Sequence, residues 1–256
     1  MTSAYGGKAG NGRLGEKMLK MLPLSAELKS GRQVEVDLVR EEEWEECMRL
    51  LNAIIEQGRA WPFDKTYTRM EDFQGYFLSH TAFVVRSTSA GLDANKKFSN
   101  PGDVMGIFYI KPNYPGRCSH VCNGGFITKE EFRMQGVGKL MGACYLKFAR
   151  ALGYEMSYFN LVFASNEESI RLWDGLGFQR VSLLKKCAKL KGIEGLVDAY
   201  GYCYDLATVD EKFDPIKVAR SRSMSPRWFA FKRLYGEWSP YLLPCFVAST
   251  IFLLIQ

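Results

Sequence analysis

The stretch that decides the fold is "FRMQGVGKLMG", residues 132–142, where three glycines stand close to an arginine. A glycine inside a helix costs about 1 kcal/mol relative to alanine. Gly136, Gly138 and Gly142 therefore indicate a helix start at which side chains would block access to the backbone. Free amide N–H groups at a helix N-terminus converge on an anion, and the helix dipole adds positive potential. Together with the charge of Arg133, this favours a nest that binds a diphosphate.

Two other phosphate-binding patterns fail on spacing. The dinucleotide fingerprint needs G-x-G-x-x-G after a plain strand, whereas the order here is R-x-x-G-x-G and the preceding strand carries Gly124 and Gly125. The P-loop needs Ser or Thr directly after its lysine, and Lys139 is followed by leucine. Both of these nucleotide-binding loops are therefore excluded.

Composition indicates a globular chain. Of its 256 residues, 47% are apolar and 24% charged, which argues against global disorder and leaves room for one large domain or two small ones. The net charge of +6 is too small to imply nucleic acid by itself, and we expect no nucleic-acid partner.

The seven cysteines are odd in number and scattered, and residues 1–20 lack the apolar core of a secretory signal. We interpret the cysteines as reduced thiols of an intracellular protein. "CSHVC", residues 118–122, suggests zinc, but the second ligand pair of a structural site is missing nearby. We expect no metal.

The chain divides by composition into four segments. Residues 1–31, rich in Gly, Lys and Ser, predict a flexible tail, with a weak organelle-targeting signal as the alternative. Residues 32–208 predict one compact α/β domain. Residues 209–236 predict a basic linker, and residues 237–256 an apolar C-terminal segment.

Hydrophobic periodicity assigns the elements of the α/β domain. Alternating patterns predict strands at residues 32–39, 81–87, 103–112, 120–128, 156–163, 178–184 and 195–206. Helical spacing predicts helices at residues 41–57, 135–152 and 166–177. The glycine pair in the fourth strand predicts a bulge or a close backbone approach.

The chain resembles the GCN5-related N-acetyltransferases. Arg133, Gly136 and Gly138 fit that family's R/Q-x-x-G-x-G/A motif for acetyl-CoA. "GGFIT", residues 124–128, stands where the family's strand is splayed open, and "NEESIRLWDGLGF", residues 166–178, matches its later Asn-to-Gly-Phe helix. The resemblance implies a mixed, mostly antiparallel sheet with a splayed strand pair that binds acetyl-CoA and helices on both faces.

The resemblance also implies a cofactor site and a mechanism. The acceptor nitrogen would attack the acetyl group directly in a ternary complex, without a covalent enzyme intermediate. Asn166 has a second interpretation, because asparagine leads the N-cap ranking and could serve the helix alone. The residues implied for acetyl-CoA are Phe126, Thr128, Arg133, Met134, Gln135, Gly136, Val137, Gly138, Lys139 and Asn166.

"FYIKPNY", "RCSH", "FNLVF" and "LGFQR" resemble a narrower group, the yeast L-azetidine-2-carboxylate N-acetyltransferases. This resemblance implies a small amine or imino acid as acceptor, a homodimer, and substrate-holding roles for Asn123 and Asn160. An asparagine is no useful base at neutral pH, so we expect water to relay the proton. Asn123 beside two glycines could instead be a turn residue, whereas Asn160 interrupts an apolar strand and needs a polar partner.

Several aromatic residues have two possible roles, in the site or in the core. Some could line an acceptor pocket or supply a general acid, but packing explains each of them as well. Trp173 lies on the apolar face of its helix, where core packing is the default. The candidates are Trp61, Phe63 and Tyr67 for the pocket, and Tyr109 and Tyr145 for the acid.

Residues 241–255 carry no charge. As a helix they would span about 22 Å, short of a hydrocarbon core of about 30 Å, and starting at Trp238 would give about 27 Å. We favour a tail anchor that holds the enzyme on the cytoplasmic side of an intracellular membrane, with the basic linker on anionic headgroups. The alternative is an apolar helix docked on the domain or on a partner.

Two classes of function stay open. One is an N-acetyltransferase for a small amine or imino acid, with a protein acceptor as a variant. The other is a non-catalytic, membrane-tethered acyl-CoA-binding module. The intact loop and the presence of Asn123 and Asn160 favour catalysis.

Overall fold

The structure is a computed structural model that describes residues 15–93 and 96–221. The chain divides into two units, residues 1–221 and 222–256, and all the described residues belong to the first. The expected apolar segment at 237–256 and most of the expected linker lie outside them. No helix among the described residues is long and apolar enough to cross a membrane.

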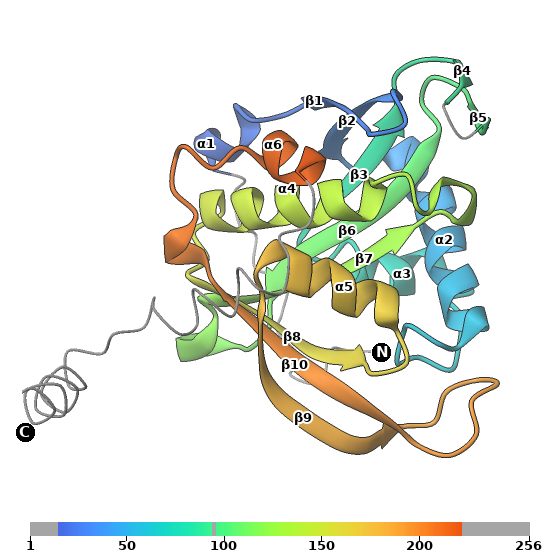
Figure 1. The fold of residues 1–256 in the computed structure, drawn as a ribbon, viewed down its shortest axis with the longest axis vertical. Helices are drawn as coiled ribbons and strands as arrows, with labels where there is room; N and C mark the ends of the chain where they lie inside the picture. Colours follow the sequence, from blue (N-terminus) through green and yellow to red (C-terminus); the bar gives the residue numbers. More distant parts are fainter. Residues whose placement is uncertain (1–14, 94–95, 222–256) are drawn as a thin grey trace, which may run out of the picture. The chain divides into compact units, whose positions relative to one another are not determined.

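The core of the fold is a twisted eight-stranded sheet with the order β1-β2-β3-β6-β7-β8-β10-β9 (Figure 1). Its neighbours pair antiparallel except for β7 and β8, which run parallel. A separate hairpin joins β4 (Gly91–Leu92) to β5 (Phe98–Ser99). The strands of the main sheet are β1 (Leu24–Glu27), β2 (Gln33–Leu38), β3 (Thr81–Ser87), β6 (Val104–Pro112), β7 (Val121–Thr128), β8 (Met156–Phe163), β9 (Gln179–Ala188) and β10 (Val197–Asp205).

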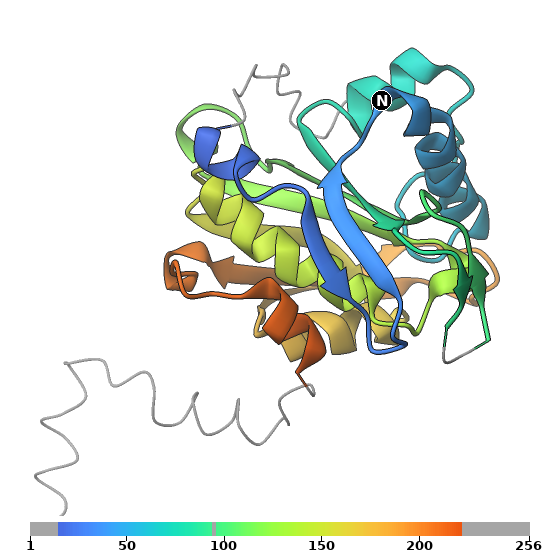
Figure 2. The ribbon, with the colours of Figure 1, turned by 90° about the horizontal axis from the view of Figure 1, so that it is seen from above.

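Helices cover both faces of the sheet, as expected (Figures 1 and 2). One face carries α1 (Glu16–Leu19), α4 (Val137–Ala151), α5 (Glu167–Leu176) and α6 (Pro215–Arg220). The opposite face carries α2 (Trp44–Gln57) and α3 (Met70–Tyr76). Four short 3-10 turns complete the described elements: η1 (Glu41–Glu43), η2 (Gly116–Cys118), η3 (Glu130–Phe132) and η4 (Leu206–Thr208).

Strand β6 shows how the sequence builds both cores. Phe108 and Ile110 pack in the cluster under α4, whereas Ile107 and Tyr109 pack in the cluster under α2 and α3. Successive side chains of a strand point to opposite faces, so a continuous apolar run is what a strand between two helical layers requires.

The structure corrects both predicted ends of the domain. Within the expected flexible tail of residues 1–31, α1 and β1 are ordered, and β1 pairs with β2. Ala26 and Leu28 are buried there. This alternation of buried and more exposed residues is too short to stand out in a segment rich in Gly and Lys. At the other end, the domain continues past residue 208, because α6 packs its apolar side against the α4 layer.

Two helices also differ from expectation. Helix α4 begins at Val137 rather than Gln135, because its N-cap, Gly136, has a φ of +95° that is incompatible with a helix. Helix α3 was not predicted, since its seven residues are too few to show a clear period.

Candidate active site

The sheet opens between β7 and β8. These strands pair only at Val121↔Met156 and Cys122↔Ser157, after which they diverge. The crossover through α4 joins them, so the N-terminus of α4 lies at the wide end of the gap. This is the splayed strand pair expected from the sequence.

Backbone amides of β7 face the gap. On the β6 side, Asn113 N donates to Val121 O at 2.8 Å and Lys129 N donates to Met105 O at 2.9 Å. Alternate residues of a strand direct their N–H groups to opposite sides, so the amide of Phe126 and, two residues on, that of Thr128 point toward β8. With β8 splayed away, these donors are open to a ligand.

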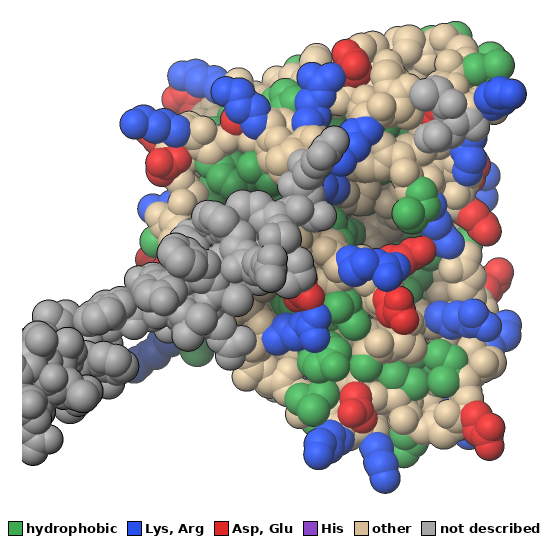
Figure 3. Space-filling model, viewed as in Figure 1, with side chains coloured by type: hydrophobic (Ala, Val, Ile, Leu, Met, Phe, Trp, Pro, Cys, Tyr) green, Lys and Arg blue, Asp and Glu red, His purple; other side chains and the backbone are tan. Residues whose placement is uncertain are grey.

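A cavity of about 1670 Å³ passes through the gap from one face of the sheet to the other. Pockets for one small ligand usually enclose about 300–1,000 Å³, so this cavity has room for a cofactor and an acceptor. Figure 3 shows the hollow on the face viewed in Figure 1. Of the residues predicted to bind acetyl-CoA or to hold the acceptor, all line the cavity except Val137, whose side chain is buried in the core: Asn123, Phe126, Thr128, Arg133, Met134, Gln135, Gly136, Gly138, Lys139, Asn160 and Asn166.

The three glycines of the opening stretch have two different roles. Gly136 caps α4 in a left-handed conformation, and Gly138 leaves space, because an added Cβ would meet nothing closer than Thr128 Oγ1 at 3.6 Å. A Cβ on Gly142, in contrast, would lie 2.5 Å from Leu176 Cδ1. Gly136 and Gly138 therefore shape the anion loop, whereas Gly142 lets α5 pack closely on α4.

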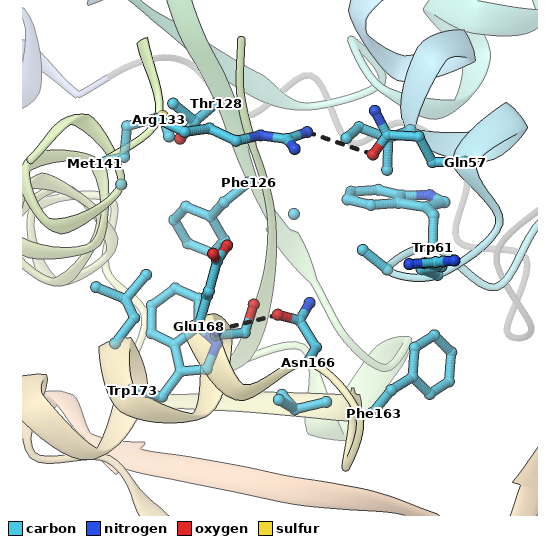
Figure 4. Close-up of a pocket in the computed structure, with 18 of the residues that line it drawn as sticks. Gln57, Trp61, Phe126, Thr128, Arg133, Met141, Phe163, Asn166, Glu168 and Trp173 are labelled. Atoms are coloured by element: carbon cyan, nitrogen blue, oxygen red, sulfur yellow. Dashed lines mark hydrogen bonds between the residues drawn. The ribbon is translucent and has the colours of Figure 1, made fainter. Parts of the chain in front are cut away.

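Positive charge surrounds the start of α4. Arg133 Nη2 donates to Gln57 Oε1 at 3.4 Å across the cavity (Figure 4). Lys139 Nζ donates to the carbonyl of Ser221 at 2.6 Å, and burial, followed by the nearby charge of Lys29, lowers the pKa of Lys139. Free amides, a helix N-terminus and these cations fit the diphosphate of an acyl-CoA.

Asn166 is the N-cap of α5, where its Oδ1 accepts from Ser169 N at 3.1 Å. The capping interpretation is therefore confirmed, and a role toward CoA stays a prediction. Trp173 packs against Phe126 and Phe159, with ring centroids 4.8 and 4.7 Å away, so it serves the core while it lines the cavity.

The two predicted substrate-holding asparagines are joined by a third. Asn123 Nδ2 and Asn160 Nδ2 donate to Asn113 Oδ1 at 3.0 and 2.7 Å, and Asn113 Nδ2 donates to Asn160 Oδ1 at 3.2 Å. Sequence reasoning missed Asn113, because an asparagine after a proline at a strand end is typical of a turn. We call Asn113, Asn123 and Asn160 the asparagine cluster.

A β-bulge brings Asn160 into this cluster. Between the pairs Tyr200↔Val162 and Tyr202↔Phe159, strand β8 places two residues, Asn160 and Leu161, opposite a single residue of β10. A bulge bends its strand and redirects side chains, and such bulges are frequent beside active sites.

Aromatic side chains form the other end of the cavity. Trp61, Tyr76 and Tyr109 line it, and the Tyr76 and Tyr109 hydroxyls lie 3.3 Å apart. Burial raises the pKa of both tyrosines, so both phenols are protonated at neutral pH. In Figure 4, Trp61 lies across the gap from Trp173, with Phe126 between them.

The glycine pair of β7 makes room for this arrangement. A Cβ on Gly124 would lie 2.6 Å from Tyr145 Cε2, and one on Gly125 would lie 2.5 Å from Trp61 Cη2. Strands β6 and β7 pair without a register shift. The pair therefore marks a close approach rather than a bulge.

The remaining candidates pack rather than line the cavity. Tyr145 is fully buried, and its hydroxyl lies 2.7 Å from Ser157 Oγ. Phe63 and Tyr67 pack on Tyr76, with ring centroids 4.9 and 6.0 Å away. In the described part of the chain, no group of three or more His, Cys, Asp or Glu side chains is placed to hold a metal ion.

A sheet opened between two parallel strands, with a glycine-rich helix start at the opening, defines an acyl-CoA-dependent transferase. The family model "Acetyltransferase (GNAT) family" matches residues 44–178, and the chain belongs to this family. N-acetyltransferase aca1 of Schizosaccharomyces pombe is 44% identical over 165 residues, which are 63% of this chain and 79% of that protein.

Solved structures share the fold. A GCN5-related N-acetyltransferase from Kribbella flavida has a TM-score of 0.58 at 20% identity, covering 67% of this chain and 97% of that chain. YncA from Salmonella typhimurium, solved with its cofactor acetyl-CoA, has a TM-score of 0.57 at 15% identity, covering 71% and 97%. The expected fold of the acetyltransferase domain is confirmed, whereas the expected C-terminal apolar helix, which lies outside the described residues, is not. The protein is an acetyl-CoA-dependent N-acetyltransferase.

Proposed function

We propose that this enzyme acetylates the nitrogen of a small amine or imino acid of the proline-analogue type, such as L-azetidine-2-carboxylate. The observation that carries the proposal is the asparagine cluster, of which Asn123 and Asn160 line the cavity. Its amides can both donate to and accept from a small polar acceptor.

On the cofactor side, the backbone of residues 134–139 and the charges of Arg133 and Lys139 would hold the diphosphate. Acetyl-CoA supplies the acetyl group. The amides of Phe126 and Thr128 would donate to the carbonyl oxygen of the acetyl group, and each such donor is typically worth a few kcal/mol in the transition state.

On the acceptor side, Asn123 and Asn160 would position the nitrogen, with Asn113 fixing both amides. No asparagine takes a proton at neutral pH, and the raised pKa values of Tyr76 and Tyr109 keep these phenols as donors. We propose that water in the cavity accepts the proton from the acceptor nitrogen.

A contact across one side of the cavity favours a small acceptor over a protein. The loop between β9 and β10 reaches the end of α2, where Lys191 N donates to Gly58 O at 2.9 Å and Arg59 Nε donates to Lys191 O at 3.3 Å. This contact spans one side of the cavity and narrows the approach of a polypeptide.

The test is a thiol-release assay with the full chain, acetyl-CoA and four acceptors: L-azetidine-2-carboxylate, L-proline, a polyamine and a lysine peptide. We expect turnover of the small imino acids, lost in Asn123→Ala and retained in the matched control Asn100→Ala, which lies outside the cavity. Turnover of the peptide alone would favour a protein N-acetyltransferase. Tight acetyl-CoA binding without release of CoA on any acceptor would favour the non-catalytic module.

The homodimer, the membrane attachment and the location on the cytoplasmic side stay predictions. Light scattering of the purified protein and fractionation of cells that express the full chain test them.

A further inference from the structure

Lys111 is a buried charge that the proposed function does not use. It lies on β6 directly opposite Asn123 of β7, and the residue is only 8% exposed. Within residues 15–93 and 96–221 it makes no ion pair with a carboxylate inside 4.0 Å. Lysine is almost never fully buried without such a partner.

The ammonium group of Lys111 lies behind the aromatic wall of the cavity. Its Nζ is 3.9 Å from the centroid of the Tyr76 ring and 4.3 Å from that of the Tyr109 ring. Its one hydrogen bond in the described chain, to Tyr76 O, is long at 3.5 Å. Ring faces attract a cation, but they leave its charge uncompensated.

The groups around this charge are donors. Trp61 Nε1, which can only donate, is buried and has no partner of normal hydrogen-bond geometry among the described residues. The hydroxyls of Tyr76 and Tyr109 keep their protons at neutral pH. His80 adds no second positive charge at neutral pH, because burial and then Lys111 lower its pKa. One of the two phenols can donate to the other at 3.3 Å, so an anionic group in the cavity could accept from the remaining phenol and from Trp61 Nε1.

We infer that Lys111 is the specificity-determining residue that recognises a carboxylate on the acceptor, next to the nitrogen held by the asparagine cluster. The inference rests on the proposed function and narrows it to an α-amino or α-imino acid. Lys111 acts by its charge and through the phenols of Tyr76 and Tyr109, which lie between it and the cavity. A polyamine or a lysine side chain would instead bring a second positive charge toward it, which is unfavourable in a site of low dielectric.

The experiment compares two ring compounds of similar shape, L-azetidine-2-carboxylate and the uncharged L-azetidine-2-carboxamide, in which an NH2 group replaces one carboxylate oxygen. Binding to the full chain saturated with CoA is measured by calorimetry, and acetylation by thiol release. We expect Lys111→Met, and equally Lys111→Gln, to weaken carboxylate binding at least about tenfold, because each removes a positive charge close to the carboxylate in a site of low dielectric. Binding of the carboxamide should change less than about twofold, within the range of a distant substitution.

Two controls separate this role from a structural one. Asn123→Ala should weaken both compounds, because it removes a group that holds the shared ring nitrogen. Lys185→Met, at an exposed position of β9, should weaken neither.

The outcomes are distinct. If the wild type acetylates the carboxylate but the Lys111 variants bind both compounds as well as before, or lose both equally, the inference is overturned and the proposed function stands. If the wild type neither binds nor acetylates either ring compound, both are overturned. Selective loss of the carboxylate supports both.

Discussion

Replacing Lys111 with methionine should stabilise the folded protein. Burial lowers the pKa of Lys111 from its ordinary value of 10.5 to about 8. Each unit of pKa corresponds to about 1.36 kcal/mol, so holding this ammonium in the folded state costs about 3 kcal/mol. Methionine keeps a linear apolar side chain and removes the charge. We therefore expect Lys111→Met to raise the free energy of unfolding at pH 7 by about 3 kcal/mol.

The pH dependence gives this gain a signature. Between pH 8 and 10.5 the unfolded chain keeps the lysine proton while the folded chain has lost it. The contribution of Lys111 to the free energy of unfolding of the wild type therefore rises with pH through this window. Below pH 8 the folded chain carries the full cost of the buried ammonium group. The advantage of Lys111→Met should accordingly be largest at pH 7 and should shrink toward pH 10.

Urea unfolding of the full chain at both pH values measures the effect. Comparing variant with wild type at each pH cancels the titration of all other groups. Lys185→Met is the matched control, because its lysine is exposed on β9, and it should change the free energy of unfolding by less than about 0.5 kcal/mol. A less stable Lys111→Met at pH 7, or an advantage of equal size at both pH values, would refute the reasoning.

Three further substitutions test the site. Gly142→Ala should lower the free energy of unfolding by about 1–2 kcal/mol net, because the clash of its Cβ, 2.5 Å from Leu176 Cδ1, outweighs the roughly 1 kcal/mol that alanine gains over glycine inside a helix; unchanged urea unfolding would contradict this. Gly136→Ala forces a side chain into φ +95° and should both destabilise by about 1–2 kcal/mol and weaken acetyl-CoA binding, measured by calorimetry; retained affinity would show that the loop is not the anion site. Asn113→Ala should raise KM for L-azetidine-2-carboxylate about tenfold, since it leaves two amides without their acceptor, while acetyl-CoA affinity stays the same; an equal loss of both would point to a general disruption.

The anion loop and the fold could be predicted because their signals are local. Arg133, Gly136 and Gly138 lie within six residues, and each is required by backbone geometry or charge at that place. The central strands are long and strongly patterned, so their periodicity survives in the sequence. Asn160 could be predicted for a similar reason, since a polar residue in an apolar strand needs a partner.

The rest of the site depends on contacts that the sequence does not display. Asn113 joins the asparagine cluster because the end of β6 lies beside the start of β7, and the bulge at Asn160 exists only in the pairing of β8 with β10. The burial of Lys111 results from α3, which was not predicted. Short elements such as β1 and α6 form because they pack on the larger sheet and helices, so composition alone assigned them to a tail and a linker.

The two-pair contact between β7 and β8 has a thermodynamic consequence. Among the described residues, strand pairing joins the part β1-β2-β3-β6-β7 of the sheet to the part β8-β10-β9 at these two pairs, and Glu155 N donates to His120 O just before them. A ligand that accepts hydrogen bonds from the open amides replaces strand pairing that is missing between β7 and β8. The stability of the contact between the two parts of the sheet therefore depends on ligand concentration. At one hundred times its dissociation constant, a ligand that binds only the folded state adds about 2.7 kcal/mol. Acetyl-CoA should therefore stabilise the sheet only while it is bound. Amide hydrogen exchange along β7 and β8 should slow as the bound fraction rises.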